Sequence, residues 1–174
     1  SESLSEQREN YRIMMTQIPI PEEVVLYSET INSAGVDWIK PRQNGTDTVI
    51  LYLHGGGYAI GDSSCYREVA SRLALATRAS IAIVNYRLAP EHPFPAALDD
   101  TVAAYSGLLQ RGHKPANIAL LGDSAGGGLV LSALMKLKQL DKTLPACSIC
   151  FSPWTDLAQT GASNRDPAIH DPLV

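Results

Sequence analysis

One pentapeptide, Gly122-Asp123-Ser124-Ala125-Gly126, constrains the fold of this chain more than any other stretch. It follows an apolar run at 118–121 that is typical of a buried strand, and a helical apolar pattern begins directly after it. G-x-S-x-G between a strand and a helix is the pattern of a nucleophile elbow, in which a strained turn holds the serine hydroxyl clear of the sheet. Similar glycine- and serine-rich stretches also occur in flexible loops, so the flanking strand and helix are what favour the elbow.

A second glycine-rich stretch, His54-Gly55-Gly56-Gly57, follows the apolar run 49–53. Glycines at the end of a strand let the backbone bend so that N–H groups can point at a developing oxyanion. We therefore predict that Ser124 is a nucleophile and that the N–H groups of Gly56, Gly57 and Ala125 form its oxyanion hole. The alternative is a phosphate cradle, but neither G-x-G-x-x-G nor G-x-x-x-x-G-K-[ST] fits 55–61 or 122–128. The two stretches thus favour acyl transfer over nucleotide binding.

Apolar periodicity predicts an α/β protein with a parallel sheet covered by helices on both faces. A capping box at Ser3 and Glu6 predicts the start of the first helix. Asp62 is the expected N-cap of the second helix, at 64–77. The expected helices are 3–18, 64–77, 96–110 and 125–140, and the expected strands are 24–31, 36–40, 49–53, 81–84, 118–121 and 147–151, the first two forming a hairpin through 32–35.

The composition excludes several classes of protein. A net charge of −4 offers no basic surface for nucleic acid, and no apolar stretch approaches the length of a membrane span. Three cysteines do not make a disulfide framework, which predicts a cytoplasmic location. Cys147 and Cys150 have C-x-x-C spacing, but within a strand they would point to opposite faces, and we interpret them as buried core thiols. We expect no metal and no cofactor.

Three motifs stand at the ends of predicted strands or just after them: His54-Gly-Gly-Gly-Tyr58, Tyr86-Arg-Leu-Ala-Pro-Glu-His-Pro-Phe-Pro95 and Gly122-Asp-Ser-Ala-Gly-Gly127. Together they resemble the hormone-sensitive lipase family of α/β-hydrolase carboxylesterases. The resemblance covers the N-terminal portion of that family only. It implies a mostly parallel eight-stranded sheet, an N-terminal cap helix, and hydrolysis of short to medium acyl esters through an acyl-enzyme on Ser124. It also implies that Gly56, Gly57 and Ala125 form the oxyanion hole.

The resemblance predicts three parts: an N-terminal cap helix at 1–21, a truncated α/β-hydrolase core at 22–153, and the start of a second cap segment at 154–174. Strands 7 and 8, the triad acid and the triad histidine are expected to be absent from this sequence, because the fold places acid and histidine late in the chain. His170 is the only histidine after Ser124, and Asp156, Asp166 and Asp171 lie near it in the sequence. Because this segment has no strand pattern and no apolar anchoring, we do not expect these residues to form a preorganised triad. The remaining histidines are expected to stabilise the glycine loop (His54), to lie in a structural turn (His92), and to be solvated or to face a helix dipole (His113).

Several alternatives stay open at this point. The elbow does not distinguish an esterase from an amidase or deacetylase on the same scaffold, because the tetrahedral chemistry is shared. The resemblance extends to receptors that keep the fold and pocket without the base, so a ligand-binding module is a second alternative. The expected partners are a small-molecule ester, a second chain or fragment that supplies the remaining strands, and a second copy in a homodimer. Tyr58 and Trp154 are candidate pocket-lining residues.

Overall fold

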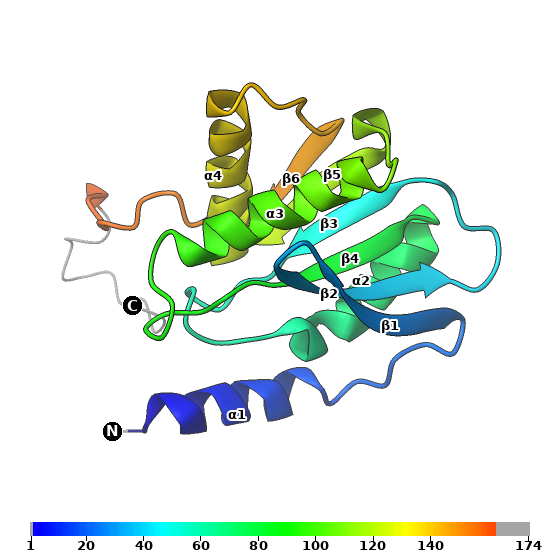
Figure 1. Ribbon diagram of the computed structural model, residues 1–174. Helices are drawn as coiled ribbons and strands as arrows, with labels where there is room; N and C mark the ends of the chain where they lie inside the picture. Colours follow the sequence, from blue (N-terminus) through cyan, green and yellow to red (C-terminus); the bar gives the residue numbers. More distant parts are fainter. Residues whose placement is uncertain (1, 163–174) are drawn as a thin grey trace.

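The apolar runs become strands of one sheet, and the periodic segments become helices that pack on it (Figure 1). The computed structural model describes residues 2–162. The strands are β1 (Val24–Ile31), β2 (Ala34–Pro41), β3 (Val49–Leu53), β4 (Ser80–Asn85), β5 (Ile118–Asp123) and β6 (Cys147–Phe151). The helices are α1 (Leu4–Met15), α2 (Ser63–Thr77), α3 (Ala96–Gln110) and α4 (Ala125–Gln139), with a short 3₁₀ turn at Pro115–Asn117.

The sheet is mostly parallel, as the sequence predicts. Its strand order is β1-β2-β4-β3-β5-β6, with β4, β3, β5 and β6 parallel and the β1–β2 hairpin antiparallel at one edge. Parallel strands need a crossover, and α2, α3 and α4 supply these connections. The seventh and eighth strands of the family's sheet, which the sequence is expected to lack, have no counterpart within residues 2–162.

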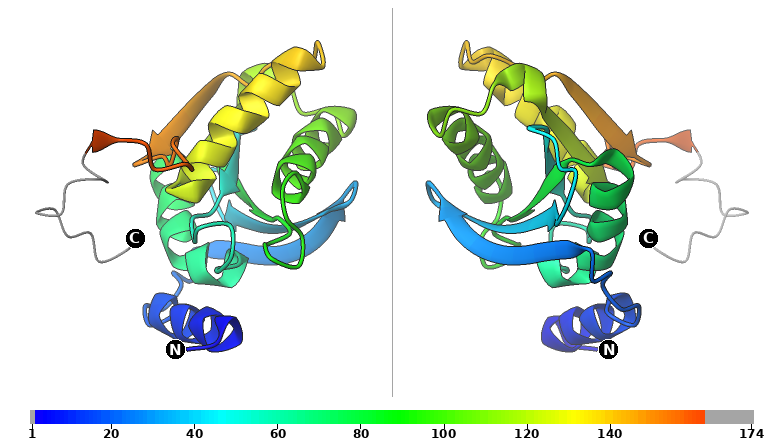
Figure 2. Two further views of the ribbon diagram at one scale, coloured as in Figure 1. Left: turned by 90° about the vertical axis from the view of Figure 1, so that its left-hand side faces the viewer. Right: turned by 90° about the vertical axis from the view of Figure 1, so that its right-hand side faces the viewer.

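Helices cover both faces of the sheet, because alternate residues of each buried strand point to opposite sides. In β3, Leu51 and Leu53 face α3 and α4, whereas Ile50 and Tyr52 face α2. Figure 2 shows the sheet between these helices, with α1 below the rest of the fold. The prediction of helices on both faces is therefore confirmed.

Helix α1 begins as predicted and ends earlier. Ser3 caps it through a complete capping box with Glu6, but the helix stops at Met15, one turn before the expected end at residue 18. The sequence predicts one apolar helical face, made up of Leu4, Tyr11, Met14, Met15 and Ile18. This prediction is partly wrong, because Met14 is 61% and Ile18 55% exposed. Tyr11 and Met15 alone of that face pack against the α2 side of the core, so α1 is attached by a narrow contact.

Strand β6 is an open edge in the part of the chain that the structure describes. It pairs with β5 on one side, and Ile149 and Phe151 are exposed large apolar residues. The interpretation of Cys147 and Cys150 as buried thiols is wrong: Cys147 is exposed and Cys150 is half-buried. The physical reason is that no further strand or helix covers this edge within residues 2–162.

The parallel strands place their carboxyl ends at one edge of the sheet. The segments that follow β3, β4, β5 and β6 begin at His54, Tyr86, Ser124 and Ser152. Ligand sites of open α/β sheets lie at this edge, and both glycine-rich stretches of the sequence are found there.

Candidate active site

Ser124 occupies the sharp turn between β5 and α4. Its backbone lies at φ 51° and ψ −120°, a region that L-residues rarely adopt. Its N–H donates to the Phe151 carbonyl at 2.9 Å, and its own carbonyl accepts from the N–H groups of Gly128 and Trp154. These bonds fix the strained backbone while the side chain makes no hydrogen bond within residues 2–162. The residue is exposed, and its hydroxyl is free to meet a ligand.

Close backbone approach explains the glycines of the elbow. A Cβ on Gly122 would lie 2.4 Å from the carbonyl oxygen of Gly126, and a Cβ on Gly126 would lie 2.0 Å from that of Leu53. Both distances are far below any van der Waals contact. The second one also shows that the start of α4 packs directly on the end of β3, which brings the elbow beside the glycine loop.

The glycine loop adopts backbone conformations that glycine tolerates best. Gly56 and Gly57 have φ of +110° and +61°, and a Cβ on Gly56 would lie 2.1 Å from the Ile60 carbonyl oxygen. The Gly56 carbonyl closes the loop by accepting from the N–H groups of Ala59 and Ile60. Within residues 2–162, the N–H groups of Gly56, Gly57 and Ala125 have no hydrogen-bond acceptor. They are therefore available donors beside an exposed serine.

Asp123 joins the elbow to the glycine loop, a contact that sequence reasoning missed. Its Oδ1 accepts a hydrogen bond of 3.0 Å from the Gly55 N–H and another of 3.0 Å from the Tyr52 hydroxyl. The Tyr66 hydroxyl donates to Oδ2 at 3.5 Å and is itself 2.8 Å from the Tyr11 hydroxyl. Burial, with the nearby carboxylate, raises the pKa of Tyr52 and Tyr66, so both stay protonated donors.

His54 stabilises the glycine loop, in line with its predicted role. Its Nδ1 donates to the Gly55 carbonyl at 2.7 Å, and its ring stacks on Tyr86 with centroids 4.3 Å apart. The Tyr86 hydroxyl in turn donates to the His54 carbonyl at 2.6 Å. Burial lowers the pKa of His54, so its imidazole is neutral near pH 7.

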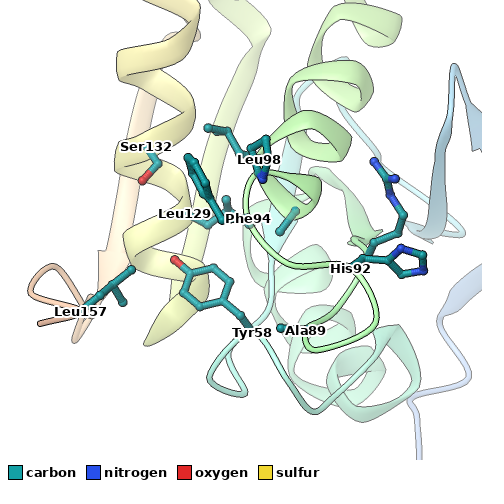
Figure 3. A pocket seen from close by; sticks show the side chains of 11 residues that line it. Tyr58, Ala89, His92, Phe94, Leu98, Leu129, Ser132 and Leu157 are labelled. Carbon is teal, nitrogen blue, oxygen red and sulfur yellow. The ribbon is translucent and has the colours of Figure 1, made fainter.

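A cavity of about 200 Å³ opens beside the elbow, between α3, α4 and the segment that follows β4 (Figure 3). Its wall is mainly apolar, and the half-buried hydroxyl of Ser132 adds a polar group. The lining residues are Tyr58, Arg87, Ala89, His92, Phe94, Pro95, Ala97, Leu98, Leu129, Ser132 and Leu157. Tyr58 thus lines a cavity, whereas Trp154 is not among the lining residues and lies near Tyr58, with ring centroids 6.4 Å apart. Ser124 is not among the lining residues. It is the N-cap of α4, the helix that contributes Leu129 and Ser132 to the cavity wall.

The remaining candidate groups lie apart from Ser124 or outside the described residues. His92 is exposed at the cavity, and His113 stacks on Trp38 with centroids 6.3 Å apart. Asp156 accepts from the backbone N–H and the hydroxyl of Thr160. His170, Asp166 and Asp171 lie outside the described residues. Within 2–162, no three His, Cys, Asp or Glu side chains gather in a metal-binding group, and no helix is long and apolar enough to cross a membrane.

The fold and this site define an α/β hydrolase. Residues 50–174 match the sequence model of a family described as having the alpha/beta hydrolase fold. The crystal structure of an esterase from the bacterial hormone-sensitive lipase family superposes with a TM-score of 0.91 at 42% identity, covering 94% of this chain and 55% of that one. The chain belongs to the hormone-sensitive lipase family of α/β hydrolases.

Relatives with assigned activities are also similar in sequence. An acetyl-hydrolase of Streptomyces hygroscopicus is 46% identical over 136 residues, which make up 78% of this chain and 45% of the relative. An esterase of Acinetobacter venetianus is 36% identical over 156 residues, which make up 88% of this chain and 51% of the relative. The chain therefore spans about half the length of these relatives.

Proposed function

We propose that this chain carries the nucleophile and the oxyanion hole of a serine carboxylesterase. The observation that carries the proposal is the exposed, strained Ser124 beside three backbone N–H groups that lack acceptors within residues 2–162. The similarity to enzymes named acetyl-hydrolase and esterase supports the same reaction. The expected partner is a small-molecule ester.

In the proposed reaction, the Ser124 Oγ attacks the ester carbonyl carbon while a general base takes the hydroxyl proton. The carbonyl π electrons move onto oxygen, and the N–H groups of Gly56, Gly57 and Ala125 stabilise the resulting oxyanion. Collapse of this intermediate expels the alcohol, which receives the proton from the base and leaves an acyl group on Ser124. Water then attacks the acyl-enzyme in the same way, releasing the acid and the free serine.

The base is not assigned to a residue of the described part. No histidine within 2–162 forms a hydrogen bond with the Ser124 hydroxyl, and His54 already donates its Nδ1 proton to the glycine loop. We propose that the acid and the histidine come from polypeptide outside these 174 residues, on the same chain or a second one. The open β6 edge supports this, because exposed apolar strand edges in native proteins are normally paired or covered.

Short to medium acyl esters are the proposed substrates. The cavity beside the elbow is apolar, and its volume of about 200 Å³ fits a short acyl chain rather than a long one. Phe94, Leu98 and Leu129 form much of its wall, and the Arg87 side chain in the lining already pairs with Asp100. We also propose a cytoplasmic location from the odd number of cysteines.

The test uses the natural polypeptide that contains this sequence, with p-nitrophenyl acetate and butyrate as substrates. We expect Ser124→Ala to lower kcat by at least about 10⁴-fold. Ser5→Ala, at an exposed position on α1, is the matched control and should leave kcat unchanged. A fluorophosphonate should modify wild type at the peptide containing Ser124 and leave Ser124→Ala unmodified.

Turnover that survives Ser124→Ala would contradict the proposed function. Hydrolysis of p-nitroacetanilide in place of the esters would favour the amidase alternative. Binding of ligands without any turnover would favour the receptor-like module. Light scattering on the same material gives the oligomeric state and decides between a monomer and the homodimer predicted from the sequence.

A further inference from the structure

The carboxylate of Asp123 has no part in the reaction proposed above, although it is adjacent to the nucleophile. It is the last residue of β5, and its Oδ1 accepts from the Gly55 N–H and the Tyr52 hydroxyl, each at 3.0 Å. The fit is close: a Cβ on Gly55 would lie 2.4 Å from Oδ2. The side chain before the serine therefore contacts the residue before the two proposed oxyanion donors.

The glycine loop needs such an external restraint. Three consecutive glycines lose more conformational entropy on folding than any other residues, and their peptide planes rotate easily. The downstream end of the loop is closed by the Gly56 carbonyl, which accepts from Ala59 and Ile60. At the upstream end, the Gly55 N–H bond to Asp123 and the His54 bond to the Gly55 carbonyl hold the peptide planes on each side of Gly55. The orientation of the next N–H groups follows from these planes.

The charge of Asp123 cannot itself favour the reaction. A carboxylate near a developing oxyanion raises the energy of that second negative charge. Within residues 2–162, no lysine or arginine pairs with Asp123, and all of its hydrogen-bond donors are neutral. The benefit of this side chain is thus geometric, and a neutral side chain of the same shape would supply it.

Hydrogen bonds also connect the second oxygen of this carboxylate to the N-terminal helix. The Tyr66 hydroxyl donates to Oδ2, which leaves it to accept from the Tyr11 hydroxyl at 2.8 Å. Tyr11 belongs to α1, and Tyr66 to α2. The elbow is in this way connected to α1 through the hydroxyl groups of Tyr66 and Tyr11.

We propose that Asp123 is a positioning residue that orients the oxyanion donors by holding the Gly55 N–H. The inference rests on the proposed function, since it assigns Gly56 and Gly57 to the oxyanion hole. It does not make Asp123 a proton donor, a base or a ligand for substrate. Its contribution is expected in kcat, because the oriented N–H groups bind the transition state more strongly than the substrate.

The test compares Asp123→Ala with Asp123→Asn in the natural polypeptide that contains this chain. We expect Asp123→Ala to lower kcat for p-nitrophenyl butyrate about 10- to 100-fold, with KM within about twofold, because the donors lose their alignment. Asp123→Asn keeps an acceptor at Oδ1 and should restore most of the lost kcat. If Asp123→Ala does not fold, Asp123→Val takes its place, since a β-branched residue suits the end of a strand.

A second readout needs no turnover. Hydrogen exchange followed by mass spectrometry should show faster exchange in a peptide covering 54–61 for Asp123→Ala than for Asp123→Asn. A peptide covering 96–110, in α3, serves as the reference and should exchange alike in both variants.

Unchanged kcat in Asp123→Ala, or equal loss in Asp123→Ala and Asp123→Asn, would overturn the inference. If either result is found and turnover still requires Ser124, the inference about Asp123 fails but the proposed function stands. Turnover that does not require Ser124 contradicts the proposed function and the catalytic part of this inference together.

Discussion

Arg8 of α1 pairs with Glu91, a residue 83 positions away in the sequence, through two parallel hydrogen bonds of 2.7 and 2.8 Å. The same guanidinium donates to the carbonyl groups of Ala59 and Ala89. Arg8 thereby joins α1 to the end of the glycine loop and to the cavity wall. Because α1 has no fully buried residue, this clamp is a main part of its attachment.

We expect the clamp to depend on pH. The Arg8 guanidinium lowers the pKa of Glu91 to about 2 from its ordinary value of 4.5. A group whose pKa is lowered by folding stabilises the folded state above its ordinary value and loses that contribution as the pH falls toward the folded value. The difference in Tm between wild type and Glu91→Gln should therefore be constant from pH 5 to 7 and shrink toward pH 2. A constant difference down to pH 2 would contradict this account.

Arg8→Ala should release α1 at neutral pH. Hydrogen exchange in a peptide covering 2–15 is expected to become faster, because three partners of the guanidinium are lost at once. Arg12→Ala is the matched control, since the Arg12 side chain pairs with Glu9 of the same helix and with no other element among residues 2–162. Equal acceleration by the two variants would show that helix propensity, not the clamp, governs the exchange.

Gly126→Ala should damage the fold itself. The added Cβ would lie 2.0 Å from the Leu53 carbonyl oxygen and 2.5 Å from that of His54. Leu53 is paired with Gly122 in the β3–β5 ladder and the His54 carbonyl accepts from the Tyr86 hydroxyl, so neither atom can move without disturbing these contacts. We expect a loss of about 3 kcal/mol in the free energy of unfolding, measured in urea. Gly45→Ala is the control: in the described part of the chain, no atom lies within 4 Å of its new Cβ, and the free energy of unfolding should change by no more than about 0.5 kcal/mol.

Filling the cavity should shorten the preferred acyl chain. Ser132 lines the cavity from α4, so Ser132→Phe would occupy much of its volume. We expect the ratio of kcat/KM for p-nitrophenyl butyrate over acetate to fall about 10-fold or more, since a lost methylene contact is worth about 1–3 kcal/mol. Leu131→Phe, at an exposed neighbouring position, should leave the ratio unchanged. An unchanged ratio in Ser132→Phe would show that the acyl chain binds elsewhere.

Asp37 should contribute to stability at neutral pH. Burial raises its pKa, but hydrogen bonds from Ser28, Arg67 and Ser63 more than offset this and lower it below 3.8. We expect Asp37→Asn to lower the free energy of unfolding, measured in urea, by about 2 kcal/mol. The loss should be smaller than for a fully buried ion pair, because Arg67 is partly exposed. Because folding lowers the pKa of Asp37, this loss of stability should diminish as the pH falls below 3.8. Arg72→Ala, which breaks an exposed pair within α2, should cost about 0.5 kcal/mol or less.

The elements of this fold could be predicted from local patterns. Strands β3 and β5 are continuous apolar runs. Asp62 is the N-cap of α2, as expected of a short polar side chain that directly precedes a segment of helical periodicity. The elbow was predictable because its pattern stands between an apolar strand and a periodic helix, and Gly122 meets the Gly126 carbonyl within the turn itself. In these cases the signal and its physical cause lie within a few residues of one another.

Contacts between distant segments could not be predicted in this way. Gly55 and Asp123 are 68 residues apart, and Tyr11 and Tyr66 are 55 apart, with no periodicity to join them. The early end of α1 and the exposure of Cys147 share a cause: the packing partners of an apolar residue are set by tertiary structure. A tyrosine at 52 within an otherwise aliphatic strand was the one local hint of a polar partner.

The backbone of Ser124 has an evolutionary consequence. A non-glycine residue at φ 51° and ψ −120° costs about 1–3 kcal/mol relative to relaxed geometry, and glycine would relieve most of it. Ser124→Gly is therefore a substitution that random mutation and selection for heat resistance would favour. A lineage selected for thermal endurance alone would drift toward glycine at this position and lose the hydroxyl that we propose as the nucleophile.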